Sequence, residues 1–280
     1  MDERVPSVAE AVADYLQSMA VSGRSTESCR ARRYLLVPLR DLDCSVLDID
    51  RQLCNRLILE RRQRVQASSV RTFSQGLSAF LTFCVEQGWL AAHPMATIKR
   101  PKAPKKPQRY LSLVQLRSVL NHCKDDYERL AVILMAGSGL RIGEVIDIRW
   151  DRINFSEGSI EVLGKGDKWR GIDASRAMPI FERLPRRGKF VYRITAFTLR
   201  TRIQRLGREI GLSWQLRPHE LRHSFAVGFL EASEEDGFTL QSILGHSSSD
   251  QTEHYIRAVR QKAAIRKMQR VNFAGHLFGE

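Results

Sequence analysis

Long apolar stretches are missing from this chain of 280 residues. No run of about 18 apolar residues occurs, which excludes a membrane-spanning helix. The first residues carry acids where a secretory signal would be apolar. Cysteine is also scarce, because the five cysteines are scattered and form no CxxC pair. This spacing argues against a disulfide framework and a cysteine zinc site. We therefore expect a reducing, cytoplasmic location.

Positive charge, in contrast, is abundant and unevenly spread. Lys and Arg number 45 against 31 acids, which gives a formal net charge of +14. Such an excess favours an anionic partner, either nucleic acid or an acidic membrane surface. Residues 1–98 carry a net charge of only +1, residues 111–280 carry +7, and the short segment 99–110 carries +6. Most of the charge therefore lies outside the first third of the chain.

The segment 99–110 is expected to be an extended linker, because it contains three prolines and no acid. An extended basic segment can follow a phosphate backbone, here through Lys102, Lys105 and Lys106. A solvated linker without contacts is the alternative.

Residues 1–98 have the apolar spacing of a small helical domain. Ser7 and Glu10 form a possible capping box. The clearest apolar stripe runs from Val70 to Cys84, and Gly88 is expected to end that helix. Three polar residues at the start of this helix predict a phosphate-binding surface, with an ordinary helix cap as the alternative: Ser68, Ser69 and Arg71.

Residues 111–280 combine helices with one predicted β-hairpin. Ser112 and Gln115 form a second possible capping box. The pattern becomes that of two short strands around residues 158–173, with a glycine-rich tip at 164–167. Helical spacing then returns, from about residue 195 onward.

A literal H-E-x-x-H motif occupies residues 219–223. On a helix it would place His219 and His223 on one face, able to hold zinc, with Glu220 as a general base. The motif is short, an arginine lies inside it, and the residues that would continue a metzincin motif are absent. We therefore expect no metal, and the zinc hydrolase is kept only as an alternative.

A larger constellation follows one order along the chain. It consists of Gly139-Leu140-Arg141-Ile142-Gly143-Glu144, Gly164-Lys165-Gly166, the run His219 to Ala226, Leu244-Gly245-His246, and Tyr255 nine residues after His246. This order and spacing resembles the tyrosine site-specific recombinases, also called the phage integrase family. The resemblance covers residues 111–280, and the first domain and linker also look like those of the family.

The resemblance implies a mainly α fold with a small antiparallel β-sheet. A helical SAM-like core-binding domain would occupy residues 1–98, the linker residues 99–110, and an α+β catalytic domain residues 111–280. A C-terminal exchange tail would begin at about residue 256. The length leaves no room for a further N-terminal arm-binding domain, so the chain is similar to the simple Xer-like or transposon-resolvase type.

The resemblance also implies a role for each residue at a DNA phosphodiester. Arg141 and Arg222 would clamp the nonbridging oxygens, because guanidinium forks fit that charge and geometry. Tyr255 would be the nucleophile, and His219 the general base that takes its proton. Glu144 matches the acidic position of the family and would orient its neighbours.

Two further groups complete the implied catalytic set. Lys165 would protonate the leaving 5′-oxygen as general acid, with Lys168 as its rival, and His246 would donate a hydrogen bond to a nonbridging oxygen. His223 is expected to have only a packing or supporting role. The stretch Glu231–Asp236 and the polar Ser249 and Asp250 depart from the usual pattern near the nucleophile.

The implied reaction needs no cofactor, because exchanging a phosphodiester for a phosphotyrosine conserves bond energy. The implied partner is a double-stranded DNA core site and not a membrane. A dimer would bind one site, and a tetramer would join two sites through a Holliday junction. The protein would thus be associated with the bacterial nucleoid. The tail would dock on a neighbouring protomer, with folding back onto its own domain as the alternative. A DNA-binding regulator without catalysis and a type IB topoisomerase are the rival functions.

Overall fold

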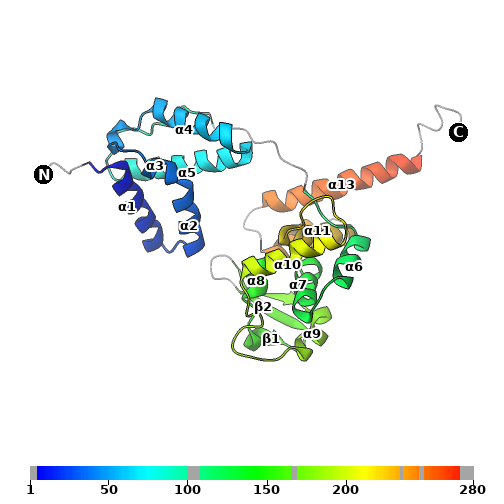
Figure 1. Cartoon of the computed structure of the whole chain (residues 1–280). Coiled ribbons are helices and arrows are strands. Elements are labelled where there is room, and N and C mark those ends of the chain that lie inside the picture. Colours follow the sequence, from blue (N-terminus) through cyan, green and yellow to red (C-terminus); the bar gives the residue numbers. More distant parts are fainter. Residues whose placement is uncertain (1–4, 100–107, 165–168, 234–235, 246–248, 272–280) are drawn as a thin grey trace. The chain divides into compact units, whose positions relative to one another are not determined.

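A computed structural model describes residues 5–99, 108–164, 169–233, 236–245 and 249–271. The chain divides into two compact units, Met1–Lys106 and Pro107–Glu280, and each is described by itself (Figure 1). Lys102, Lys105 and Lys106, which we predicted to contact DNA, lie outside the described residues. Within the described residues, no helix combines the length and the apolar character that crossing a membrane requires.

The first unit is helical in all its described regular elements. Ser7 and Glu10 form the predicted capping box at its start. Its helices are α1 (Val8–Val21), α2 (Thr26–Leu35), α3 (Val37–Arg40), the 3-10 turn η1 (Val46–Asp48), α4 (Arg51–Arg64) and α5 (Ala67–Glu86).

Helix α5 forms the centre of this unit. The residues of its predicted apolar stripe are all buried, among them Phe73, Leu77 and Phe80. The helix ends at its C-cap, Gln87, and Gly88 follows with a φ of 75°. Such a left-handed conformation suits glycine and explains why the helix stops there.

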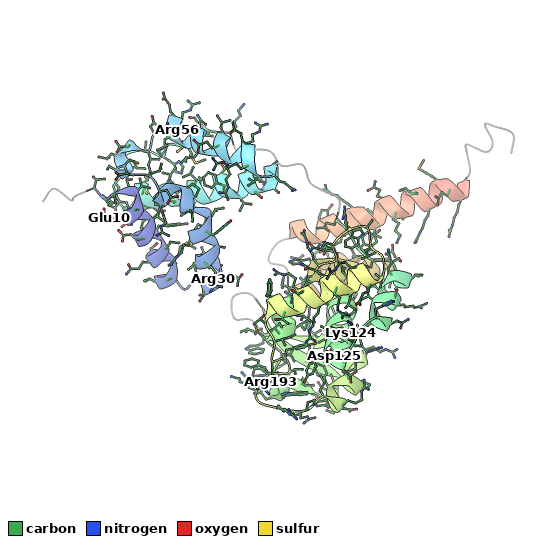
Figure 2. The ribbon with its side chains drawn as sticks, in the orientation of Figure 1. Glu10, Arg30, Arg56, Lys124, Asp125 and Arg193 are labelled. Atoms are coloured by element: carbon green, nitrogen blue, oxygen red, sulfur yellow. The ribbon has the colours of Figure 1, made fainter. Side chains whose placement is uncertain are left out.

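Helix α2 packs on α5 without burying any of its own residues. Gly76 permits this approach, because a Cβ at that position would lie 2.1 Å from Leu35 Cδ2. Figure 2 labels two exposed arginines of this unit, Arg30 on α2 and Arg56 on α4.

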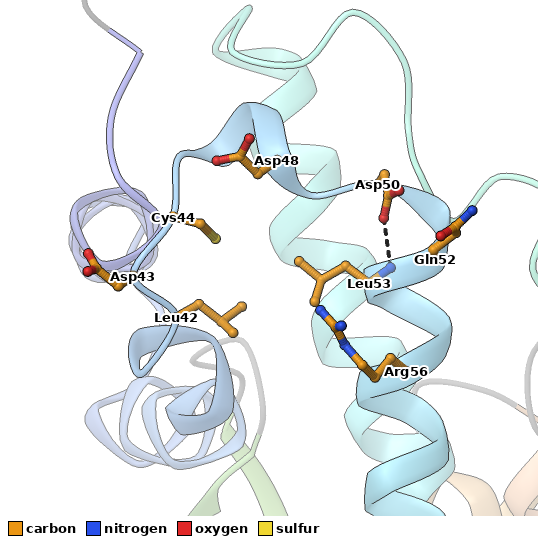
Figure 3. A pocket seen from close by; sticks show the side chains of 8 residues that line it. All are labelled: Leu42, Asp43, Cys44, Asp48, Asp50, Gln52, Leu53 and Arg56. Atoms are coloured by element: carbon orange, nitrogen blue, oxygen red, sulfur yellow. Dashed lines mark hydrogen bonds between the residues drawn. The ribbon is translucent and has the colours of Figure 1, made fainter.

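A cavity of about 560 Å³ opens between η1 and α4 (Figure 3). Two of its acids already cap their own helices: Asp48 accepts from the Ser45 N–H at 2.8 Å and Asp50 from the Leu53 N–H at 2.7 Å. The acidic lining does not favour a phosphate. Its residues are Leu42, Asp43, Cys44, Asp48, Asp50, Gln52, Leu53 and Arg56.

The second unit surrounds a small sheet with helices. Strands β1 (Ile153–Asn154), β2 (Ser159–Leu163) and β3 (Trp169–Asp173) form an antiparallel sheet in that order. Ile160 pairs with Ile172, which confirms the predicted hairpin. The helices and turns are α6 (Leu113–Asn121), α7 (Asp126–Gly137), α8 (Ile142–Ile146), η2 (Trp150–Arg152), η3 (Ser175–Ala177), α9 (Met178–Arg183), α10 (Ala196–Glu209), α11 (Pro218–Ala232), α12 (Gly237–Leu244) and α13 (Ser249–Val271).

The predicted fold class, mainly α with a small antiparallel sheet, is confirmed. The capping box of Ser112 and Gln115 is also present, at the start of α6. Helix α7 is the buried centre of the unit and packs against α11. A second apolar cluster joins α11, α12 and α13 and includes Tyr255 and Val259.

Helix α13 differs from the expected tail. It runs without a break through residue 256, where we expected the tail to begin, and Val259 of the same helix is buried. From residue 263 to residue 270 every side chain of the helix is exposed, and Met268 is 73% exposed. Tyr255 is therefore held by the same continuous helix that later leaves the domain surface.

Candidate active site

The carboxylate of Glu144 is the centre of the site. Arg141 is the N-cap residue of α8, and its backbone N–H donates to Glu144 Oε2 at 2.8 Å. The Arg141 side chain donates as well, from Nη1 to Oε1 at 2.9 Å. Arg141 and Glu144 therefore form an i, i+3 ion pair, which fixes Arg141 at the start of the helix.

Two more arginines reach the same carboxylate from distant parts of the chain. Arg170 on β3 donates from Nη2 to Glu144 Oε2 at 3.0 Å. Arg222 on α11 lies with Nη1 3.8 Å from that oxygen. Burial by itself would raise the pKa of Glu144, but the donors Arg170 and Arg141 and their charges hold it below its usual value. One buried anion thus holds three cations together.

The last turn of α12 also binds all three arginines. Three successive carbonyl oxygens each accept from a different guanidinium: Ile243 from Arg170 Nε at 2.9 Å, Leu244 from Arg222 Nη2 at 2.8 Å, and Gly245 from Arg141 Nη2 at 3.4 Å. The C-terminus of a helix carries partial negative charge, which favours cations there. These carbonyl oxygens therefore offset part of the positive charge of the three arginines and fix the positions of their guanidinium groups.

Arg222 is the most deeply buried of the three, with 3% of the residue exposed. Its Nη1 also donates to the Gly139 carbonyl oxygen at 2.7 Å. Burial, followed by the positive charge of Arg141, lowers the pKa of Arg222 to about 10. The guanidinium consequently remains charged at neutral pH, which a phosphate clamp requires.

Tyr255 lies on α13 with only 4% of the residue exposed. Its hydroxyl forms a hydrogen bond with Nδ1 of His223, over 2.5 Å. Burial raises the pKa of Tyr255, while the charges of Arg222 and Arg141 act in the opposite direction. The charges of Arg141 and Arg222 thus favour the phenolate form of Tyr255.

His223 thus contacts the Tyr255 hydroxyl, which fits the supporting role that we expected for it. Burial, followed by the charges of His219 and Arg222, lowers the pKa of His223 to about 4. The ring is thus neutral at pH 7 and is able to accept the phenolic hydrogen.

His219 lies one turn earlier on α11 and stacks on His223, with ring centroids 6.0 Å apart. Unlike His223, it is exposed. Burial of part of the ring and the nearby Arg222 and Arg141 lower the pKa of His219. Glu220, the base of the alternative zinc reading, instead accepts from the Arg217 N–H at 2.9 Å and caps its own helix. Across the described residues, no group of three His, Cys, Asp or Glu side chains could hold a metal ion.

The structure brings four of the six predicted catalytic residues into one cluster: Arg141, His219, Arg222 and Tyr255. Lys165, its rival Lys168, and His246 lie outside the described residues. So do residues 234–235, within the stretch Glu231–Asp236, and the side chains of Ser249 and Asp250. Strand β2 ends just before the predicted lysine tip and β3 begins just after it, and α12 ends just before His246.

Sequence reasoning missed Arg170. A signal was available, because alternate residues of a strand face the same side and Arg170 shares its face with the buried Ile172. A basic residue on the buried face of a strand requires a partner. Here those partners are Glu144 and the end of α12.

The predicted phosphate-binding residues of the first unit lie in the first turn of α5. Ser68, Ser69 and Arg71 are all exposed. The N-cap of this helix is Gln66, without a side-chain capping hydrogen bond, so the alternative reading of the serines as an ordinary cap is wrong.

The site thus combines a buried tyrosine with clustered arginines and histidines, in a helical unit with one small antiparallel sheet. The sequence profile of the Phage integrase family matches residues 109–262. This chain belongs to that family, the tyrosine site-specific recombinases, and is a site-specific DNA recombinase.

Curated relatives support this assignment over most of the chain. The tyrosine recombinase XerC of Xylella fastidiosa (strain M23) is 31% identical over 232 residues, covering 75% of this chain and 77% of the relative. The tyrosine recombinase XerC of Vibrio cholerae serotype O1 (strain M66-2) is 29% identical over 227 residues, covering 74% and 73%.

Two solved structures share the fold. A lambda integrase (75–356) dimer bound to a COC′ core site superposes with a TM-score of 0.73 at 19% identity, covering 86% of this chain and 96% of that one. The XerH site-specific recombinase bound to a palindromic difH substrate gives a TM-score of 0.74 at 15% identity, covering 96% and 98%.

Proposed function

We propose that this protein binds a double-stranded DNA core site and cleaves its strands with Tyr255, through a 3′-phosphotyrosine intermediate. Four copies on two sites would then exchange strands through a Holliday junction. The observation that carries this proposal is the cluster of Tyr255 with two arginines. The Tyr255 hydroxyl bonds to His223, the residue after Arg222 on α11, and Arg222 and Arg141 both face the Glu144 carboxylate. A nucleophile beside two phosphate-binding groups is what transesterification of a phosphodiester requires.

Arg141 and Arg222 would bind the nonbridging oxygens of the scissile phosphate. The Arg141 side chain is 34% exposed and so is accessible to DNA. Arg222 is fixed by the carbonyl oxygens of Gly139 and Leu244, so its guanidinium is oriented before DNA arrives. Donors that are already oriented need no reorganisation as negative charge builds up on the phosphate.

The phenolic proton must leave as the Tyr255 oxygen bonds to phosphorus. His219 is the proposed acceptor, because it is exposed beside the arginines and its lowered pKa keeps it neutral. His223 holds the hydroxyl in place through its 2.5 Å contact. The bond from phosphorus to the 5′-oxygen breaks, and Lys165 would supply the proton to that oxygen. His246 would donate to a nonbridging oxygen.

The remaining DNA contacts would come from the first unit and the linker. Ser68, Ser69 and Arg71 are exposed on the first turn of α5, where the partial positive charge of the helix N-terminus also favours an anion. Lys102, Lys105 and Lys106 would follow the backbone between the two units. This division of labour, with a core-binding domain, a linker and a catalytic domain, is part of the proposal.

The assembly is proposed from the structural relatives and from α13. Lambda integrase has been solved as a dimer on a core site and as a tetramer on a Holliday junction. In this chain the part of α13 from residue 263 to residue 270 is exposed. We propose that this part and the residues after it dock on a neighbouring protomer.

Replacing Tyr255 with Phe tests the proposed function. The variant should bind a site selected from random duplex DNA as the wild type does, because the phenyl ring still fills its buried position. It should form no covalent protein–DNA complex, because the attacking oxygen is missing. Denaturing gels of a labelled substrate measure the complex.

The matched control is Tyr34→Phe, which removes the hydroxyl of a tyrosine that is 73% exposed. Covalent attachment by Tyr255→Phe would exclude Tyr255 as the nucleophile. Binding by the wild type without any covalent complex would instead favour a non-catalytic regulator. Relaxation of supercoils without a partner site would favour a type IB topoisomerase.

A further inference from the structure

Arg170 connects three parts of the second unit. It extends from β3, donates from Nη2 to Glu144 on α8 at 3.0 Å, and donates from Nε to the Ile243 carbonyl oxygen of α12 at 2.9 Å. Only 15% of its side chain is exposed. The arginine fork is planar, so these two directed bonds set the position of Glu144 relative to the end of α12.

The surroundings of Arg170 leave little space. Gly245 has a left-handed φ of 59°, and a Cβ at that position would lie 3.3 Å from Arg170 Nη1. This Nη1 is buried and has no hydrogen-bond partner among the residues that the structure describes. An unpaired buried donor costs free energy. The unpaired Nη1 therefore lowers the stability of the fold, while the other two bonds of Arg170 fix the geometry around Glu144.

Arg170 also controls how Glu144 meets the two clamp arginines. Its Nη2 is bonded to Oε2, while Arg222 Nη1 stays 3.8 Å from the same oxygen and donates to Gly139 instead. Without Arg170, Oε2 would lose a cationic donor and would attract Arg222 away from that carbonyl. The clamp would then change its geometry although none of its own residues had changed.

We propose that Arg170 is a positioning residue for strand cleavage, which links β3 to Glu144 and the last turn of α12 and so holds Arg141 and Arg222 ready for the phosphate. This inference rests on the proposed function, because it concerns how the phosphate clamp is held. Arg170 itself need not touch DNA. Its effect should appear wherever a charged phosphate has to be stabilised, and should fade where that charge is absent.

The test compares Arg170→Gln with the wild type in single-turnover formation of the covalent complex. One selected DNA site carries a normal phosphodiester at the cleaved position, and a second carries a methylphosphonate, which lacks the negative charge. We expect the phosphodiester rate to fall by about 100-fold, as for a misplaced catalytic group, with DNA binding unchanged. The methylphosphonate rate should change little, and Arg170→Lys should restore part of the phosphodiester rate.

Arg183→Gln is the matched control. Arg183 likewise donates two hydrogen bonds, both to the carboxylate of Asp126 at 3.2 Å, but its side chain is 55% exposed. The Arg183→Gln variant should cleave both substrates as the wild type does.

An unchanged phosphodiester rate in Arg170→Gln would overturn the inference. So would an equal loss on both substrates, which indicates a general structural defect. Thermal unfolding shows whether the variant folds, and Arg170→Lys serves for the same comparison if it does not. A wild type that forms no covalent complex would refute the proposed function itself, and so is distinguished from a failure of Arg170.

Discussion

Gly139 shows how one residue without a side chain shapes the site. Its φ is +71°, and a Cβ there would lie 2.5 Å from a Phe225 ring atom and 2.8 Å from Leu244 Cδ2. Its carbonyl oxygen at the same time accepts from Arg222. Glycine is thus required both by the backbone conformation and by the close approach of α11 and α12.

Gly139→Ala should therefore lower the free energy of unfolding by about 2–3 kcal/mol, because it combines strained φ with a steric clash. Chemical denaturation measures this change. The control is Gly143→Ala on the neighbouring helix α8, where no atom lies within 4 Å of the added Cβ. That variant should be neutral or slightly more stable, since alanine favours helix. Equal effects of the two substitutions would contradict the requirement for glycine at position 139.

The lowered pKa of His223 should make the free energy of unfolding depend on pH. Its pKa is about 4 in the folded protein against an ordinary 6.5, so between these values the unfolded chain binds a proton that the folded protein refuses. The stability that a neutral His223 provides is present above pH 6.5 and is lost as the pH falls towards 4. In His223→Asn the amide oxygen can still accept from the phenol but does not titrate.

Comparing the wild type with His223→Asn separates the contribution of His223 from that of the other groups that titrate in this pH range. On going from neutral pH to below pH 5, the wild type should lose roughly 2 kcal/mol more unfolding free energy than the variant does. Denaturation at a series of pH values measures the difference. A difference that stays constant with pH would show that His223 titrates normally in the folded state.

At the scale of elements, α13 has two halves with different surroundings. The half around Tyr255 packs against α11 and α12. Lys262 adds an ion pair with Glu231 at 2.6 Å and lies over the Tyr110 ring. Beyond Lys262 the described side chains up to residue 270 are exposed. A helix without tertiary contacts is marginal in water.

Amide hydrogen exchange should divide α13 at this point. The amides of residues 255–262 should exchange slowly, and those of residues 263–270 should exchange near the rate of a fraying helix. Mass spectrometry of peptides from the two halves gives this directly for the free protein. Uniform protection along the helix in the monomer would show that the second half has an intramolecular partner.

At the scale of the whole molecule, the end of the chain is proposed to join protomers. A chain ending after Arg270 should keep cleavage of a single suicide site, because Tyr255 and its contacts lie earlier in α13. Cooperative binding of two half-sites should weaken, because the proposed docking segment is shortened. Denaturing gels measure the cleavage, and gel-shift titration on one and two half-sites measures the cooperativity of binding. Unchanged cooperativity would contradict the docking proposal.

The sequence by itself determined the elements and the membership of the family. Apolar spacing and capping residues predicted α5, the starts of α1 and α6, and the hairpin, because such signals act between residues three or four apart or across a short turn. The ordered set from Arg141 to Tyr255 likewise indicated the recombinase class. These features depend on local order along the chain.

Only the tertiary structure decided how the site is held together. Arg170, Glu144 and the end of α12 are far apart in sequence, and their contacts depend on how the sheet packs against the helices. The contact of Tyr255 with His223 depends in the same way on the packing of α13 against α11. Long-range contacts of this kind follow from the shape of the packed core, which no short pattern records.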